Sequence, residues 1–489
     1  MKIGHRFNLP EYSPLPLRAQ ICELIGSAIS TGTIGPGQPL PSCRDLSRQL
    51  GVSRNTVFSS YEQLKEMGIV ISKDRSGYFV NLEFVRGSVE VKIHAIQENS
   101  VVSSRLPSLG KRPSDLRKIE HPLDWNQFPF PFVYNQIDPN KFPIQNWREC
   151  MRLALNKQRL PVWSGDSDGA DSTALVEQLR KRLLSYRGLR VSPDEILITA
   201  GAQNALFIIG LLFHDTCGAV GVEEPGYPEA RNAFQLSGNR IQALKVDSAG
   251  LDPDTIPAEC GMIYTTPSHQ FPTGVTMSLE RRKRLLDVAQ ANRSVIVEDD
   301  YEAEMNYVRD TLPSVLALDQ TGSVIYVGSL SKTVSPGLRL GFMVAPPDII
   351  REARALRRAI LRHPPTILQD AMAHFIGLGY YDANLRSLHR RYRSRWQAMK
   401  DAISRHMPSV QLTPGEGGTC FWADVGPNVD TKELESRLKN KGVLYDNGFV
   451  FYMEPNRGNG KLRLGFASVP LKSIEPGIRV IGEEIAALA

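Results

Sequence analysis

The 489-residue chain has little that would place it in a membrane or outside the cell. Its longest apolar run, Ala205–Phe213, has nine residues, whereas a bilayer span needs about 20. The first residues, from Met1 to Arg6, lack the apolar core of a signal peptide. The six cysteines include no C-x-x-C pair, which argues against a zinc site and a disulfide framework. We therefore expect a cytoplasmic protein with free thiols, no membrane segment and no metal.

The chain also lacks a large excess of positive or negative charge. The 58 Lys and Arg residues against 52 Asp and Glu residues give a net charge of +6, which permits nucleic-acid binding without indicating it. The length predicts two or more domains. Three regions differ in composition and predicted secondary structure. Residues 1–84 are predicted to contain short helices and a hairpin, 85–122 resemble a linker, and 123–489 alternate strands with amphipathic helices.

Two short helices joined by a tight turn are predicted near the N-terminus. Ser42 begins a capping-box pattern that opens a helix running to about Leu50, and Gly51 makes the turn. Ser53 caps a second helix that extends to about Met67. This is helix-turn-helix geometry, in which the first turn of the second helix faces base edges and phosphates.

A hairpin with a basic tip follows the two helices. Apolar strands at 69–71 and 78–80 bracket a tip that carries Lys73 and Arg75. A small docking or dimerisation module is the alternative, because helix-turn-helix spacing gives many false positives. The basic residues and the hairpin favour DNA binding. The first turn of the second helix supplies the candidate contacts Ser53, Arg54, Asn55 and Thr56.

A set of residues across this region carries a resemblance to a known family. They are Pro41, Arg44, Leu46, Leu50, Val52, Arg54, Thr56, Val57, Tyr61, Leu64, Gly68, Gly77, Phe79 and Val80. The pattern resembles the winged-helix domain of the GntR regulators. The resemblance implies that Arg44, Arg54 and Thr56 touch DNA and that Gly77 lies in a wing tip at the minor groove.

The large C-terminal region is predicted to be an α/β fold. Strands are expected at 195–199, 219–222, 262–265, 294–298, 323–328 and 340–344, with a charged helix at 279–292. Parallel sheets bind ligands at the carboxyl ends of their strands. The segments that follow these strands are therefore the first place to look for a site.

A lysine with hydroxyl neighbours follows one of these strands. Ser329 and Ser331 precede Lys332, and Arg339 lies seven residues further on. An amine forms a Schiff base with an aldehyde, while hydroxyls and a guanidinium hold a phosphate. The segment therefore suits a cofactor that carries both groups, although taken alone most lysines in such a motif are solvated.

The predicted strand that comes before the one leading to Lys332 ends in two acids and a tyrosine. Asp299 or Asp300 could pair with a protonated pyridine nitrogen. Tyr301 could donate to the phenolic oxygen of the same ring. The alternative is an acidic cap on a strand end, which is common.

Other candidate ligand residues are spread along the chain. Gly201, Ala202 and Gln203 lie between a strand and a helix, where backbone N–H groups collect phosphate. Tyr227 follows another strand and could stack on a pyridine ring. Arg463 stands among apolar residues and is either paired structurally or kept for an anionic ligand.

The order of these pieces over residues 123–489 resembles the fold type I pyridoxal-phosphate aminotransferases. The resemblance implies a large domain with a mainly parallel sheet and a smaller C-terminal α+β subdomain. It implies that Lys332 bears pyridoxal phosphate, Asp299 pairs with its ring nitrogen, Tyr227 stacks on it, and Arg463 clamps an effector carboxylate. Phe271 holds the position of the asparagine of true aminotransferases, so full transamination is in doubt.

Both modules in this order resemble the MocR/GabR-type subfamily of GntR regulators. The resemblance implies a pyridoxal-phosphate-dependent transcriptional regulator that senses an amino compound through an external aldimine at Lys332. It implies a head-to-tail homodimer on a double-stranded operator with paired half-sites. A catalytically active aminotransferase with an accessory DNA-binding domain, or a direct sensor of the cofactor controlling vitamin B6 synthesis, are the alternatives. The identity of the effector stays open, as does activation or repression.

One stretch is rich in positive charge. Residues 351–395 contain ten arginines against three acids. Solvated faces of amphipathic helices are the default interpretation. An extension of the DNA path is the alternative.

Overall fold

The computed structural model describes residues 7–10, 12–73, 76–86, 112–134, 137–166, 168–302, 304–307, 311–413, 415 and 417–488. The chain forms two compact units, Met1–Leu109 and Gly110–Ala489. Within the described residues, no helix has the length and apolarity to cross a membrane.

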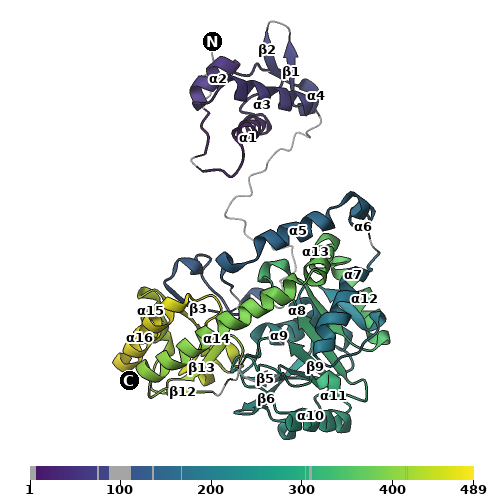
Figure 1. Ribbon diagram of the computed structural model, residues 1–489, viewed down its shortest axis with the longest axis vertical. Helices are drawn as coiled ribbons and strands as arrows, with labels where there is room; N and C mark the ends of the chain where they lie inside the picture. The colour runs from purple at the N-terminus through teal and green to yellow at the C-terminus, as the bar shows by residue number, and fades with distance from the viewer. Residues whose placement is uncertain are drawn as a thin grey trace, which may run out of the picture. The chain divides into compact units, whose positions relative to one another are not determined.

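The first unit is built from short helices and a hairpin (Figure 1). Its elements are α1 (Leu17–Ser30), α2 (Cys43–Leu50), α3 (Arg54–Glu66), β1 (Val70–Lys73), β2 (Gly77–Val80) and α4 (Leu82–Arg86). Ser42 and Ser53 cap α2 and α3, and each hydroxyl accepts a backbone N–H at 3.1 Å. Gly51, at φ +67°, makes the turn between the two helices. The predicted helix-turn-helix and hairpin are confirmed.

A large mixed sheet forms the centre of the second unit. Its strands are β4 (Ile196–Thr199), β5 (Ala219–Glu224), β6 (Arg240–Asp247), β7 (Gly250–Leu251), β8 (Met262–Thr265), β9 (Val295–Asp300), β10 (Val324–Ser329) and β11 (Gly341–Val344). They lie in the order β4-β11-β10-β9-β8-β5-β6-β7. The pairs between β10 and β6 along this order are parallel, and β11 runs antiparallel to both neighbours. The predicted strands are therefore present.

Helices cover both faces of this sheet. They are α5 (Ile144–Ala154), α6 (Leu160–Ser164), α7 (Thr173–Gln178), α8 (Ala202–Leu212), α9 (Pro228–Leu236), α10 (Leu279–Asn292), α11 (Val315–Leu318), α12 (Pro347–Leu361) and α13 (Thr366–Gly377). Side chains of β9 alternate between the two faces: Val297 packs in the core with α8 and α9, and Ile296 packs in the core with α10. This alternation, set by the pleat of the strand, decides where the acids that end β9 point.

A smaller sheet holds the C-terminal part of the chain. It contains β12 (Gln411–Leu412), β13 (Cys420–Asp424), β15 (Lys461–Gly465), β14 (Val443–Asn447) and β3 (Phe130–Phe132), in that order. The helices α14 (Tyr380–His406), α15 (Thr431–Asn440) and α16 (Leu471–Leu488) belong to the same subdomain. β3, blue in Figure 1, pairs in parallel with β14 among the yellow elements. The subdomain is thus completed by a segment from the start of the unit.

Candidate functional site

A cavity opens where the central strands of the large sheet end. It is lined by Tyr134, Ala202, Gln203, Tyr227, Tyr264, Phe271, Asp299, Tyr301, Ser329, Ser331, Lys332 and Arg339. The segments that follow β4, β5, β9 and β10 thus meet here, as ligand-binding segments of a parallel sheet do. All the predicted cofactor residues except Gly201 line the cavity, and Gly201 directly precedes Ala202.

Lys332 is buried, and its amine has no hydrogen-bond partner. Its Nζ lies 3.7 Å from the ring centroid of Tyr134 and 5.5 Å from that of Tyr301. Burial lowers the pKa of Lys332 to about 7, although Glu302 acts in the opposite direction. An amine with such a pKa is substantially neutral at neutral pH, which is the state that attacks a carbonyl carbon.

The two acids that end β9 have different surroundings. The Oδ2 of Asp299 accepts a hydrogen bond from Tyr264 at 2.9 Å, while its Oδ1 has no partner, and burial raises its pKa to about 7. Asp300 points to the opposite face, where it pairs with Arg187 at 2.5 Å and accepts from Tyr326 at 3.0 Å. Although burial alone would raise the pKa of Asp300, the charges of Arg187 and Arg282 and the hydrogen bonds from Ser268 and Tyr326 together outweigh it and lower that pKa. Asp299 is therefore the acid with a free oxygen and a place on the cavity wall.

The predicted phosphate turn lies at the start of α8. Gly201 has a φ of +86°, a conformation that favours glycine. A Cβ at this position would lie 2.9 Å from Nη2 of Arg339. Ser329 and Ser331 lie on the same wall, and Ser331 N donates to Ser329 Oγ at 3.3 Å. These backbone N–H groups, hydroxyls and one guanidinium are the donor set that a phosphate needs.

Aromatic rings form one side of the cavity. Phe271 is 1% exposed, and its ring centroid lies 5.0 Å from those of both Tyr134 and Tyr227. It offers no hydrogen-bond donor. The hydroxyl of Tyr301 donates to the carbonyl of His269 at 2.9 Å, and not toward the cavity. The predicted role of Tyr301 as a donor to a ring oxygen stays a prediction.

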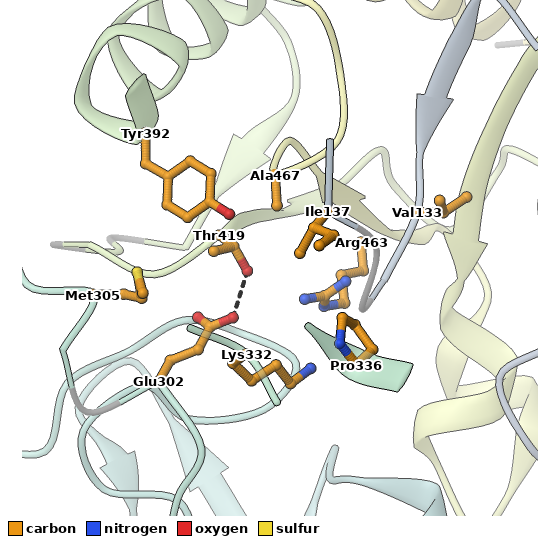
Figure 2. Close-up of a pocket in the computed structure, with 10 residues that line it drawn as sticks. All are labelled: Val133, Ile137, Glu302, Met305, Lys332, Pro336, Tyr392, Thr419, Arg463 and Ala467. Atoms are coloured by element: carbon orange, nitrogen blue, oxygen red, sulfur yellow. Dashed lines mark hydrogen bonds between the residues drawn. The ribbon is translucent and has the colours of Figure 1, made fainter. Parts of the chain in front are cut away.

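Lys332 also lines a second cavity, which Arg463 lines as well (Figure 2). Glu302, Lys332 and Arg463 point into this space, and Thr419 donates to Glu302 at 2.5 Å. Arg463 is 1% exposed, its Nη1 donates to Asp446 at 2.8 Å, and its Nε has no partner. Arg463 is thus paired within the protein, and its role in binding an anionic ligand stays a prediction.

Sequence reasoning missed several residues of this site. Tyr264 lies on a predicted strand, and an alternating pattern could have placed it beside Asp299. Glu302 follows the acidic strand end directly. Tyr134 and Asp446 come from the small subdomain, and no local pattern connects them with Lys332. Only the pairing of β3 with β14 brings that subdomain to the cavity.

The predicted DNA contacts lie on the surface of the first unit. Arg44, Arg54 and Asn55 are exposed. Ser53 and Thr56 are joined by a hydrogen bond of 2.8 Å between their hydroxyls at the start of α3. Lys73 and Gly77 bound the hairpin tip, with Gly77 at φ +97°. Arg75 lies outside the described residues. These contacts stay predictions.

Several arginines of the 351–395 stretch have structural partners. Arg354 and Arg357 both pair with Asp171, and Arg395 pairs with Asp138. Arg357 is fully buried. This part of the stretch therefore stabilises the second unit, and exposed positions such as Arg390 are the ones left for another role.

The cavity fits pyridoxal phosphate. The unpartnered amine of Lys332 faces the space where an aldehyde would lie, and the free Oδ1 of Asp299 faces the space where a ring nitrogen would lie. The start of α8 supplies the phosphate donors. Within the described residues, no group of three His, Cys, Asp or Glu side chains could hold a metal ion.

Comparisons with known proteins agree with this site. Residues 17–80 match the bacterial regulatory proteins of the gntR family, and residues 150–481 match aminotransferase class I and II. The HTH-type transcriptional regulator TauR of Rhodobacter capsulatus is 35% identical over 480 residues, which cover 96% of each chain. The probable rhizopine catabolism regulatory protein MocR of Rhizobium meliloti is 28% identical, with 97% of this chain and 94% of the relative covered.

A solved structure supports the same conclusion for the second unit. Kynurenine aminotransferase of Pyrococcus horikoshii has a TM-score of 0.68 and 29% identity, with 74% of this chain and 92% of that chain covered. That fold implies pyridoxal phosphate as the cofactor. The chain therefore belongs to the MocR-type subfamily of GntR transcriptional regulators, in which a helix-turn-helix domain precedes an aminotransferase domain of fold type I.

Proposed function

We propose that this regulator carries pyridoxal phosphate on Lys332 and responds to a primary amine that also bears an anionic group. The observation that carries the proposal is the position of Lys332. Its side chain lines both the cavity that fits the cofactor and the cavity that contains Arg463. A compound bound in the second cavity is therefore next to the bond that holds the cofactor.

The cofactor, when bound, supplies an aldehyde carbon that exchanges one amine for another. The protein contributes orientation and charge. Asp299 would pair with the ring nitrogen of the cofactor, and the N-terminus of α8 would hold its phosphate. Arg463 offers its free Nε to the anionic group of the incoming compound. Burial lowers the pKa of Lys332 to about 7, so its amine, when not bonded to the cofactor, would be partly neutral at neutral pH.

On the DNA side, the first turn of α3 and the hairpin tip contact the operator. Two chains in a head-to-tail homodimer present two such domains, which suits an operator with paired half-sites. The protein acts where its DNA is, in the cytoplasm. Effector and DNA are coupled only if each binds the two states of the dimer with different affinity.

The first test is the absorption spectrum of the purified full-length protein with pyridoxal phosphate. We expect a visible band that borohydride fixes onto Lys332, and that Lys332→Ala abolishes. Lys400→Ala is the matched control, because Lys400 is an exposed lysine of α14 and should keep the band. A protein that takes up no cofactor would overturn the proposal.

The second test separates sensing from catalysis. Amino compounds that shift the band should do so once per protomer. Keto acid released over many turnovers would instead favour an aminotransferase. Arg463→Ala should keep the band and lose the response to compounds with a carboxylate or sulfonate. Regulation that survives this substitution would favour a direct sensor of the cofactor.

A further inference from the structure

Asp446 lies between Arg463 and the segment that enters the second unit. One oxygen, Oδ2, accepts from Arg463 at 2.8 Å, and the other, Oδ1, lies 3.4 Å from Nε2 of His121. The side chain of Asp446 is fully buried, and that of His121 is 13% exposed. His121 Nε2 is itself buried and makes no hydrogen bond of good geometry, so a small shift of Asp446 would complete one. We call residues 117–121 the strap.

Arg117, the first residue of the strap, is hydrogen-bonded to the segment between β14 and β15. The guanidinium of Arg117 donates to the carbonyls of Phe449 at 3.2 Å, Tyr452 at 2.9 Å and Met453 at 2.5 Å. Its own carbonyl accepts from Asn232 on α9 at 2.8 Å. These three carbonyls accept three of the five N–H donors of the guanidinium and hold the strap against the unit.

The middle of the strap touches the wall of the cofactor cavity. Ile119 N donates to Glu229 at 3.1 Å, in the first turn of α9, which begins directly after Tyr227. The Ile119 side chain packs on the aromatic cluster that includes Phe271 and Tyr301. The strap therefore contacts the cofactor wall through Ile119 and the effector arginine through His121 and Asp446.

Charge balance couples these contacts. Arg463 and Asp446 are both almost fully buried, and as a pair they are neutral. An anion that binds Arg463 competes with Asp446 for its positive charge, in a cavity that Glu302 and Lys332 also line. Arg463 then stabilises the carboxylate of Asp446 less. A hydrogen bond from the strap to Asp446 therefore contributes more free energy, because an unpaired buried carboxylate is costly.

We propose that Asp446 is a positioning residue that transmits the occupancy of Arg463 to the strap, so that an anionic effector draws Asp446 toward His121 and tightens the strap. The strap lies at the C-terminal end of the predicted linker (85–122), so its release or fixation changes where the free part of that linker begins. The inference rests on the proposed function, since it takes Arg463 as the effector site.

The test uses stable cofactor adducts as probes on the full-length protein. N-(5′-phosphopyridoxyl) derivatives of glycine, β-alanine and 4-aminobutyrate carry a carboxylate. Alkylamine adducts of the same length lack it. Binding is followed by fluorescence, and strap release is followed by the rate of tryptic cleavage after Arg117 and Lys118, with the cut bonds identified by mass spectrometry. We expect the tightest acidic adduct to slow cleavage at least about fivefold relative to its alkylamine match.

Variants separate the coupling from the binding. His121→Gln and Asp446→Asn should each reduce the difference in cleavage between the matched adducts to less than about twofold. His121→Gln should weaken the acidic adduct by no more than the lost coupling, about fivefold, and leave the affinity for the alkylamine adduct unchanged, because Arg463 keeps its partner. Glu120→Gln is the control within the strap, since Glu120 is 71% exposed and pairs only with Lys118, and it should keep the full difference.

Each remaining outcome has one meaning. Equal cleavage with both adducts in the wild-type protein, or an unchanged difference in His121→Gln, would overturn the inference and leave the cofactor site intact. Carboxylate adducts that bind no better than their alkylamine matches would refute Arg463 as the effector site. Failure to bind any adduct would refute the proposed function, and the inference with it.

Discussion

Replacing Asp299 by asparagine should stabilise the protein without cofactor and weaken its hold on pyridoxal phosphate. Burial raises the pKa of Asp299 from 3.8 to about 7. Between these two values the folded protein binds a proton that the unfolded chain does not. The stability of the cofactor-free protein should therefore fall as the pH rises from about 4 to about 7, and asparagine should abolish this loss.

The magnitude follows from that pKa. One pKa unit corresponds to about 1.4 kcal/mol, so ionised Asp299 destabilises the cofactor-free fold by up to about 4 kcal/mol. The hydrogen bond from Tyr264 survives the substitution, because the amide oxygen accepts it. The new amide N–H group lacks a partner at a cost of about 1–3 kcal/mol. We expect a net gain of about 2 kcal/mol above pH 7, or roughly 2–4 °C in Tm for a unit of this size.

When the cofactor is bound, we expect Asp299→Asn to destabilise the protein instead of stabilising it. A carboxylate that faces a protonated ring nitrogen makes a charge-assisted hydrogen bond worth about 1.5–3 kcal/mol. Asp299→Asn should therefore weaken cofactor binding about 10- to 150-fold. Thermal unfolding at pH 5 and pH 8, with and without pyridoxal phosphate, measures both effects on the same two proteins.

Asp300→Asn is the matched control. It leaves Arg187 without its buried carboxylate partner and should lower the Tm of both forms, because breaking a buried ion pair costs about 3–5 kcal/mol. If Asp299→Asn lowers the Tm of the cofactor-free protein as Asp300→Asn does, or leaves cofactor affinity unchanged, the assignment of Asp299 to the ring nitrogen is wrong.

Three further variants test the two units. Arg54→Ala should weaken operator binding by about 1–3 kcal/mol if this residue reads a base, and an unchanged footprint would refute its role. Gly201→Ala should reduce cofactor affinity about tenfold, since a Cβ there is strained by the positive φ and crowds a guanidinium; titration of the visible band measures it. Reversing the charge of the exposed Arg386, Arg390 and Arg393 together should leave the salt dependence of DNA affinity unchanged, whereas a flatter slope would place them on the DNA path.

Local sequence patterns were sufficient to predict many of the helices and strands of this protein and its candidate cofactor residues. Capping serines and a positive-φ glycine specify the helix-turn-helix, because those interactions reach only a few residues along the chain. Short apolar runs specify the strands of the large sheet, and the pleat then sends Asp299 and Asp300 to opposite faces. The cofactor residues could be predicted because each directly follows a strand, and parallel strands bring their ends together.

What only the tertiary structure decided lies between distant segments. The sequence shows Arg463 as a lone arginine among apolar residues, and it leaves open whether the arginine is paired or free. The fold answers by placing Asp446 on the neighbouring strand and His121 beside it, more than 300 residues earlier in the chain. The long-range ion pairs of several arginines in residues 351–395 likewise could not be predicted from the sequence. Buried charges choose partners by proximity in space, because their interaction energy depends on distance and burial and not on sequence separation.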